Sequence, residues 1–136
     1  MVLLISFTFA ATTALSAADM AYSLKVTVDI SPGLKGRTRP DQTVFIFAKA
    51  VQGPRAPLAA VRAQVKDLPM TVTLDDSKAM APMFKLSRFK NVKISARVSQ
   101  NGGAMKMSGD LEGVSPEIRL EKNNKPVNLT IDHVVK

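Results

Sequence analysis

The sequence contains no cysteine and no tryptophan, and it has a single tyrosine and a single histidine. Without cysteine there can be no disulfide, no thiolate metal site, no thiol–disulfide exchange and no CxxCH haem attachment within this sequence. With six phenylalanines in 136 residues, aliphatic side chains must fill most of any core. This sequence therefore cannot carry out thiol chemistry on another protein itself.

Motifs of catalysis and cofactor binding are also missing. The sequence shows no P-loop, dinucleotide fingerprint, GxSxG elbow or zinc-ligand spacing. The histidine, His133, continues the inward phase of the last apolar strand, as a strand-end histidine would. The adjacent Asp75 and Asp76 are explained by the end of a strand, because side chains of neighbouring residues in an extended chain point to opposite sides. We predict no catalytic residues, no cofactor and no enzymatic activity.

Acidic residues are few, 11 against 19 lysines and arginines, which gives a net charge of +8. The cations are spread over turns and outward strand positions, among them Lys93 and Arg97. Aromatic residues do not interleave with these charges as a nucleic-acid stacking platform requires, so no nucleic-acid partner is expected. The pattern predicts a basic solvated surface; attraction to anionic lipid head groups or to acidic partner segments is the alternative.

Residues 1–18 are uncharged and mostly apolar, and they end in small side chains. This stretch is short for a membrane span and is typical of a signal peptide, although it lacks the usual basic start. An uncleaved N-terminal anchor and a first part of the fold are the alternatives. We therefore expect export to the periplasm and a single domain over residues 19–136.

Alternation of apolar and polar residues predicts a series of short strands joined by Gly, Pro and Asn turns. Residues 43–51 are apolar on both faces and should form a central strand. Residues 101–103 predict a hairpin turn, followed by Met105 and Met107 at strand spacing and a loop over 109–116. The pattern favours an all-β, Ig-like antiparallel sandwich of about seven strands, over residues 22–30, 43–51, 58–66, 70–74, 91–100, 117–120 and 127–131.

Three stretches together carry a family resemblance: DQTVFIFAKAVQGPRAPLAAVRAQV, KDLPMTVTLDDSKAM and VKISARVSQNGGAMKMSGDLEG. From about Ser23 to its end the chain resembles the C-terminal Ig-like domain of the CycH (CcmI) family of bacterial cytochrome c maturation. The resemblance implies a non-enzymatic accessory module, a chaperone-like role in holding apocytochrome c for haem ligation, and maturation subunits as partners. Family members place this domain after a membrane-anchored helical TPR part, whereas a short apolar leader precedes it here.

For a binding module of this kind, we expect the contacts in the loop after Asp76 and in exposed arginines. The loop offers adaptable apolar side chains, because methionine packs against irregular surfaces. The guanidinium groups offer charge for carboxylates. The predicted protein-binding residues are Met80, Met83, Phe84, Arg37, Arg39, Arg55 and Arg88.

Two alternatives to the maturation role remain open from the sequence. Thioether sulfur atoms bind Cu(I), so a periplasmic copper-binding protein is one of them, although methionine is also a common core filler. A purely structural assembly module is the other. The predicted ligands of the copper alternative are Met80, Met83, Met105, Met107 and His133.

Overall fold

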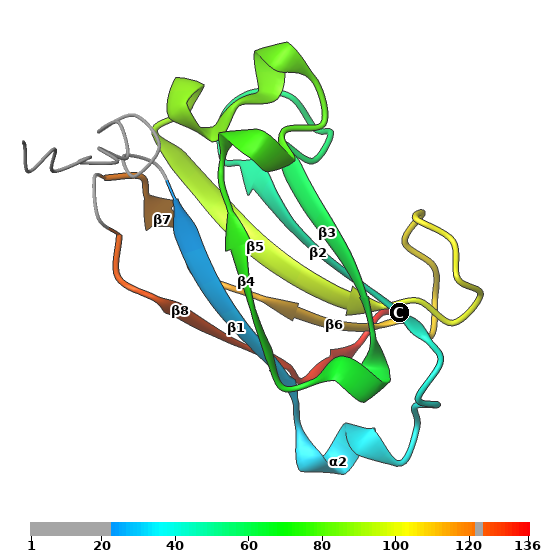
Figure 1. The fold of residues 1–136 in the computed structure, drawn as a ribbon. Coiled ribbons are helices and arrows are strands. Elements are labelled where there is room, and N and C mark those ends of the chain that lie inside the picture. The colour runs from blue at the N-terminus through cyan, green and yellow to red at the C-terminus, as the bar shows by residue number, and fades with distance from the viewer. Residues whose placement is uncertain (1–22, 122–123) are drawn as a thin grey trace, which may run out of the picture.

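The computed structural model describes residues 23–121 and 124–136, which form two β-sheets packed face to face (Figure 1). The smaller sheet has the strand order β4-β1-β8, and the larger has the order β3-β2-β5-β6-β9, with β7 paired to β5. The predicted all-β sandwich is confirmed. The strands are β1 (Leu24–Ile30), β2 (Thr43–Ala50), β3 (Ala59–Gln64), β4 (Met70–Leu74), β5 (Asn91–Val98), β6 (Leu111–Val114), β7 (Ile118–Arg119), β8 (Val127–Ile131) and β9 (His133–Val134).

Short helical turns connect some of these strands. A single turn, α2 (Pro32–Lys35), lies in the basic loop after β1. The 3-10 turn η1 (Val65–Asp67) follows β3, and three more follow β4: η2 (Asp76–Lys78), η3 (Pro82–Phe84) and η4 (Leu86–Arg88). None of the helices in the described part of the chain has the length and hydrophobicity to cross a bilayer. The predicted leader, residues 1–18, lies outside the described residues.

The smaller sheet follows the alternation of its sequence. In β1 the side chains of Leu24, Val26, Val28 and Ile30 are buried, and the residues between them face outward. Strand β4 pairs with β1 in antiparallel direction, whereas β8 pairs with it in parallel. The parallel pair departs from the expected antiparallel arrangement, because the strand before β8 in sequence, β7, belongs to the larger sheet and no hairpin joins β8 to β1.

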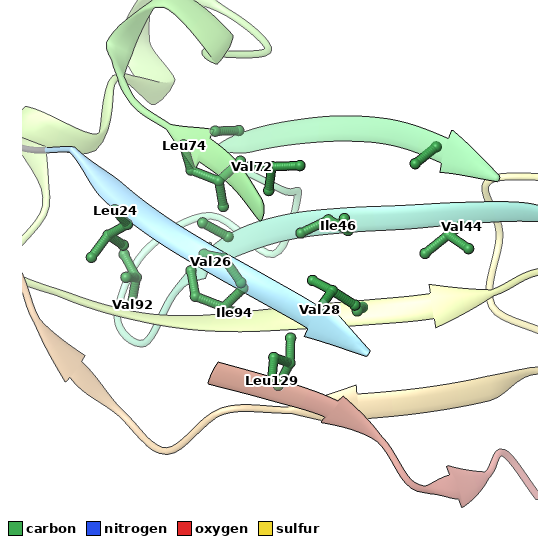
Figure 2. Packing of buried hydrophobic residues seen from close by; sticks show 14 of the residues in the cluster. Leu24, Val26, Val28, Val44, Ile46, Val72, Leu74, Val92, Ile94 and Leu129 are labelled. Carbon is green, nitrogen blue, oxygen red and sulfur yellow. The ribbon is translucent and has the colours of Figure 1, made fainter. Parts of the chain in front are cut away.

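The core is aliphatic, as the scarcity of aromatic residues predicts. Val26 and Val28 of β1 face Ile46 of β2 and Ile94 of β5 across the space between the sheets, and Leu129 closes one side (Figure 2). The predicted strand over residues 58–66 is confirmed as β3, and its last residues turn into η1.

Residues 101–116 differ from the sequence prediction in two ways. Met105 and Met107 lie in the loop between β5 and β6 and are 81% and 48% exposed, so their expected place in a strand is wrong. The carbonyl oxygens of Ala104 and Met105 accept hydrogen bonds from Arg97, which holds this stretch away from strand pairing. Conversely, the predicted loop over 109–116 contains β6.

Two further expectations need correction. Arg97 does point to the outer face of its sheet, but it is buried, because the loop over residues 99–110 folds over it. His133 does not continue the inward phase of β8. The chain leaves the smaller sheet after Ile131, the Asp132 N–H donates to the Glu112 carbonyl oxygen, and His133 begins β9 beside β6 with a half-exposed side chain.

Gly113 lies where the backbone of β8 passes very close to β6. A Cβ on Gly113 would lie 2.0 Å from the Thr130 carbonyl oxygen, far inside van der Waals contact. The oxygen is a backbone atom and the Cβ is fixed directly to the backbone, so neither can give way without moving a strand. The absence of a side chain at this position therefore allows the two sheets to close over the β8–β9 crossing.

We predict that Gly113→Ala destabilises the domain by about 3 kcal/mol, the upper range for overpacking. The measurement is the free energy of unfolding from urea titration. Gly33→Ala is the matched control, because no heavy atom lies within 4 Å of the Cβ that it adds. Equal free energies of unfolding for the two variants would contradict the close approach of the Thr130 carbonyl oxygen to Gly113.

Candidate binding groove on the larger sheet

The outer face of the larger sheet carries a cavity of about 510 Å³. Its floor is formed by β2, β3, β5 and β6, and loops raise its two ends. An antiparallel sheet with one face on the core normally presents polar side chains on the other. Here that other face is partly apolar and hollowed, and we call it the outer groove.

One row of residues runs across the larger sheet and places an aromatic ring among charged side chains. The strand register aligns Arg62, Phe45, Arg97, Glu112 and His133 on neighbouring strands. The Phe45 ring lies between two guanidinium groups, with its centroid 5.2 Å from the Arg62 Cζ and 5.4 Å from the Arg97 Cζ. These distances suit cation–π interactions on both sides of the ring.

The next row of the floor is mostly apolar. The register aligns Ala60, Phe47, Ser95 and Val114 on β3, β2, β5 and β6. Phe47 is 9% exposed, whereas Val114 is 44% exposed. Together with the Phe45 ring, this row gives the groove a recessed apolar surface of the size of one or two side chains.

Arg97 and Asp110 form a buried ion pair, with side chains 4% and 0% exposed. The Arg97 Nη1 lies 2.9 Å from the Asp110 Oδ2. The same carboxylate accepts hydrogen bonds from the backbone N–H groups of Gln100 and Met107. The ion pair between Arg97 of β5 and Asp110 of the loop thereby fixes the loop over residues 99–110. Ala104 of this loop forms part of the groove wall.

At the opposite end, the wall of the groove is built from Pro57 and Met80. The Met80 N–H donates to the Leu58 carbonyl oxygen at 2.9 Å, and Ala79 makes a β-bridge with Ala59 of β3. The Asp76 carboxylate holds the following part of the segment between β4 and β5 by hydrogen bonds to Ser87. These contacts set the methionine at the groove although its side chain is 60% exposed.

Asp75 and Asp76 have structural roles, as predicted from their position after a strand. Asp75 caps η2 by accepting a hydrogen bond from the Ser77 N–H at 2.9 Å. Asp76 accepts from the N–H and the hydroxyl group of Ser87, at 3.0 and 2.7 Å. Both carboxylates thus organise the segment between β4 and β5.

Cations dominate the rim of the groove. The Lys49 Nζ lies 5.5 Å from the Phe47 ring centroid, and Arg62 lies over Phe45. Lys106 pairs with the nearly buried carboxylate of Glu112, whose Oε1 is 2.9 Å from the Lys106 Nζ and 3.5 Å from the His133 Nε2. Within the described residues neither Lys49 nor Arg62 has a carboxylate within ion-pair distance, so their charges face the groove uncompensated.

The residues predicted to bind protein are not gathered in one place. Met80 lines the outer groove, whereas Met83 is exposed on η3 and Phe84 packs partly against the core. The loops that carry Arg55 and Arg88 lie at the same end of the sandwich as the methionines (Figure 1). The loop with Arg37 and Arg39 follows α2 at the other end (Figure 1). All of these assignments remain predictions.

The residues of the copper alternative fall into separate groups. Met80 and Met83 lie between β4 and β5, and Met105 and Met107 lie on the loop that leads to β6. The Met107 Sδ lies 2.7 Å from the Asn101 Nδ2, and the His133 Nδ1 lies 3.0 Å from the Asp132 Oδ1. Among residues 23–121 and 124–136, no three His, Cys, Asp or Glu side chains form a metal-binding group. The copper site remains a prediction from sequence.

Sequence reasoning missed the residues that build the groove, above all Phe45, Phe47, Arg97, Asp110 and Glu112. A signal for the two phenylalanines is present, because the strand that holds them is apolar on both faces. The charged residues give no such signal, since only the strand register brings them together.

The family model of the cytochrome c-type biogenesis protein H Ig-like domain matches residues 24–132. The chain belongs to this family. The cytochrome c-type biogenesis protein CycH of Pseudomonas aeruginosa is 44% identical over 110 residues, which cover 81% of this chain and 26% of that protein. The chain thus spans about a quarter of the relative's length. No solved structure matches this CycH-type Ig-like domain.

We predict that Arg97→Met lowers the free energy of unfolding by about 3–5 kcal/mol, because it leaves the Asp110 charge buried without its partner. Urea titration measures this loss. Arg62→Met is the control and should change stability by less than about 1 kcal/mol, because this guanidinium lies at the exposed rim.

A double variant, Arg97→Met with Asp110→Asn, removes both charges and should regain part of the lost stability. If the double variant loses more unfolding free energy than the two single variants lose together, the loss cannot be assigned to an unpaired charge.

Proposed function

We propose that this chain is a non-enzymatic binding module in c-type cytochrome maturation, which holds apocytochrome c or a maturation subunit against the outer groove. The observation that carries this proposal is the apolar floor of the groove on a sheet face that is not part of the core. Membership of the CycH Ig-like family supplies the pathway, and the periplasm is the proposed site of action.

The dimensions of the groove support a binding role. Its volume lies within the range of about 300–1,000 Å³ that is usual for ligand sites. An apolar surface left open to water is unfavourable by about 25 cal/mol per Å², so covering the phenylalanine floor with a partner's side chain releases free energy. The walls at both ends limit the groove to a short segment of polypeptide.

The chemistry of the groove favours binding over catalysis. The Glu112 carboxylate in its lining is held in an ion pair with Lys106, and the Asp110 carboxylate beside the groove is held in one with Arg97. An unfolded apocytochrome segment is a variable ligand, and the exposed thioether of Met80 can adjust its rotamer to different side chains.

We predict that Met80→Gln weakens the binding of apocytochrome c peptides about fivefold, the effect of losing ~1 kcal/mol of apolar contact. The full chain is titrated with fluorescent peptides tiled across an apocytochrome c, and the dissociation constant is read from anisotropy. Met83→Gln is the matched control, because Met83 has a similar exposure, 64% against 60%, and does not line the groove.

Equal effects of the two substitutions would place binding outside the groove, and no saturable binding of any peptide would remove the proposed function. The titration is repeated with Cu(I) under reducing conditions. Binding that requires the metal would favour the copper alternative over a peptide-binding module.

A further inference from the structure

We infer that the outer groove selects extended acidic segments in which two carboxylates flank one apolar side chain at the spacing Glu-x-apolar-x-Glu. This inference rests on the proposed function and names the class of partner segment that the groove takes. It commits to a polypeptide and not to a lipid surface.

The apolar part of the segment is recognised by the groove floor. Phe45 and Phe47 are two residues apart on β2, so their rings follow one another along the strand at about 7 Å. Val114 of β6 adds exposed apolar surface beside Phe47 in the register. A single Phe, Leu or Met side chain inserted here is surrounded by apolar atoms on the side of the sheet.

Two cations without a carboxylate partner among the described residues have their backbone positions at the ends of this floor, and their charged groups lie over the two rings. Arg62 is in the register row of Phe45, and Lys49 is two residues beyond Phe47 on β2. Four residues of strand therefore separate the two positions, or about 13 Å. Side chains at i and i+4 of an extended peptide have the same separation and the same direction, with i+2 between them.

The surroundings of the cations make carboxylates the matching ligand. Among the residues that the structure describes, Glu112 supplies the one carboxylate in the groove lining, and it is already paired with Lys106. Arg97 also lines the groove, and its buried Nε–H has no hydrogen-bond partner in the described structure. The groove thus has more donors and positive charge than acceptors, which a segment with two acidic side chains balances.

The shape of the groove favours a peptide over a membrane. Interfacial binding requires apolar side chains that protrude into the head-group region. The apolar floor here is recessed instead, with Phe47 91% covered and walls raised by Pro57 and Ala104. A flat bilayer cannot reach these rings, whereas one side chain of an extended chain can.

The test compares fluorescein-labelled ten-residue peptides with a central Glu-Ala-Phe-Ala-Glu and with Gln-Ala-Phe-Ala-Gln, titrated against the full chain. We expect about tenfold tighter binding of the acidic peptide at low salt, and a much smaller difference at about 0.5 M NaCl, where charges are screened within a few Å. A third peptide, Ala-Glu-Phe-Glu-Ala, keeps the composition but changes the spacing, and it should bind more weakly than the first.

Variants locate the recognition on the protein. Lys49→Gln with Arg62→Gln should abolish the preference for the acidic peptide and leave the glutamine peptide unaffected. Lys25→Gln with Arg119→Gln is the matched control, because it removes the same charge from exposed positions outside the groove and should keep the preference.

Equal affinities for the acidic and glutamine peptides, or equal effects of the two double variants, would overturn the inference. Met80-dependent binding of apocytochrome segments without the acidic spacing would overturn it while leaving the proposed function in place. Binding of the acidic peptide without any apocytochrome binding would support the inference and overturn the proposed function. Competition by vesicles of phosphatidylcholine and phosphatidylglycerol that depends on Lys49 and Arg62 would show that the groove serves a lipid surface instead.

Discussion

The buried ion pair between Arg97 and Asp110 determines the shape of the outer face of this domain. Two charges this far from water are tolerated only when each is paired and its remaining groups are bonded. The pair meets most of that condition by using the backbone of residues 99–110, whose carbonyl and N–H groups hydrogen-bond both side chains. Among the described residues, only the Arg97 Nε–H of this pair is left without a partner. The wall of the groove is therefore fixed by polar contacts, while its floor stays apolar and open.

Much of the fold can be predicted because β1 and β5 each turn one face to the core, which imposes a period of two on their sequences. That period fails where tertiary contacts decide. Met105 and Met107 have strand spacing, yet the guanidinium of Arg97 captures the neighbouring carbonyl groups. The short strand β6 contains Gly113, a residue typical of loops, because the Thr130 carbonyl oxygen approaches too closely for a side chain.

The site was harder to predict than the fold. Exposed arginines in loops and a methionine loop are visible in the sequence, and of these residues Met80 lines the groove. The row that carries Arg62, Phe45 and Arg97 comes from three strands, and its members are neighbours only in one register. Because neighbouring side chains of a strand point to opposite faces, the sequence shows that Phe45 and Phe47 lie on the face opposite to Val44 and Ile46. It does not show which other residues surround the two rings.

The contrast between the two sheets supports a binding role for the larger one. On the outer face of the smaller sheet, Lys25, Thr27 and Thr71 follow the usual rule for a solvated sheet, and the two threonine hydroxyl groups are 2.9 Å apart. Stability thus does not require aromatic rings on an outer face of this sandwich. The larger sheet nevertheless places Phe45 and Phe47 there, between guanidinium and ammonium groups that lack carboxylate partners. This departure in both hydrophobicity and charge supports the proposal that a partner covers this surface.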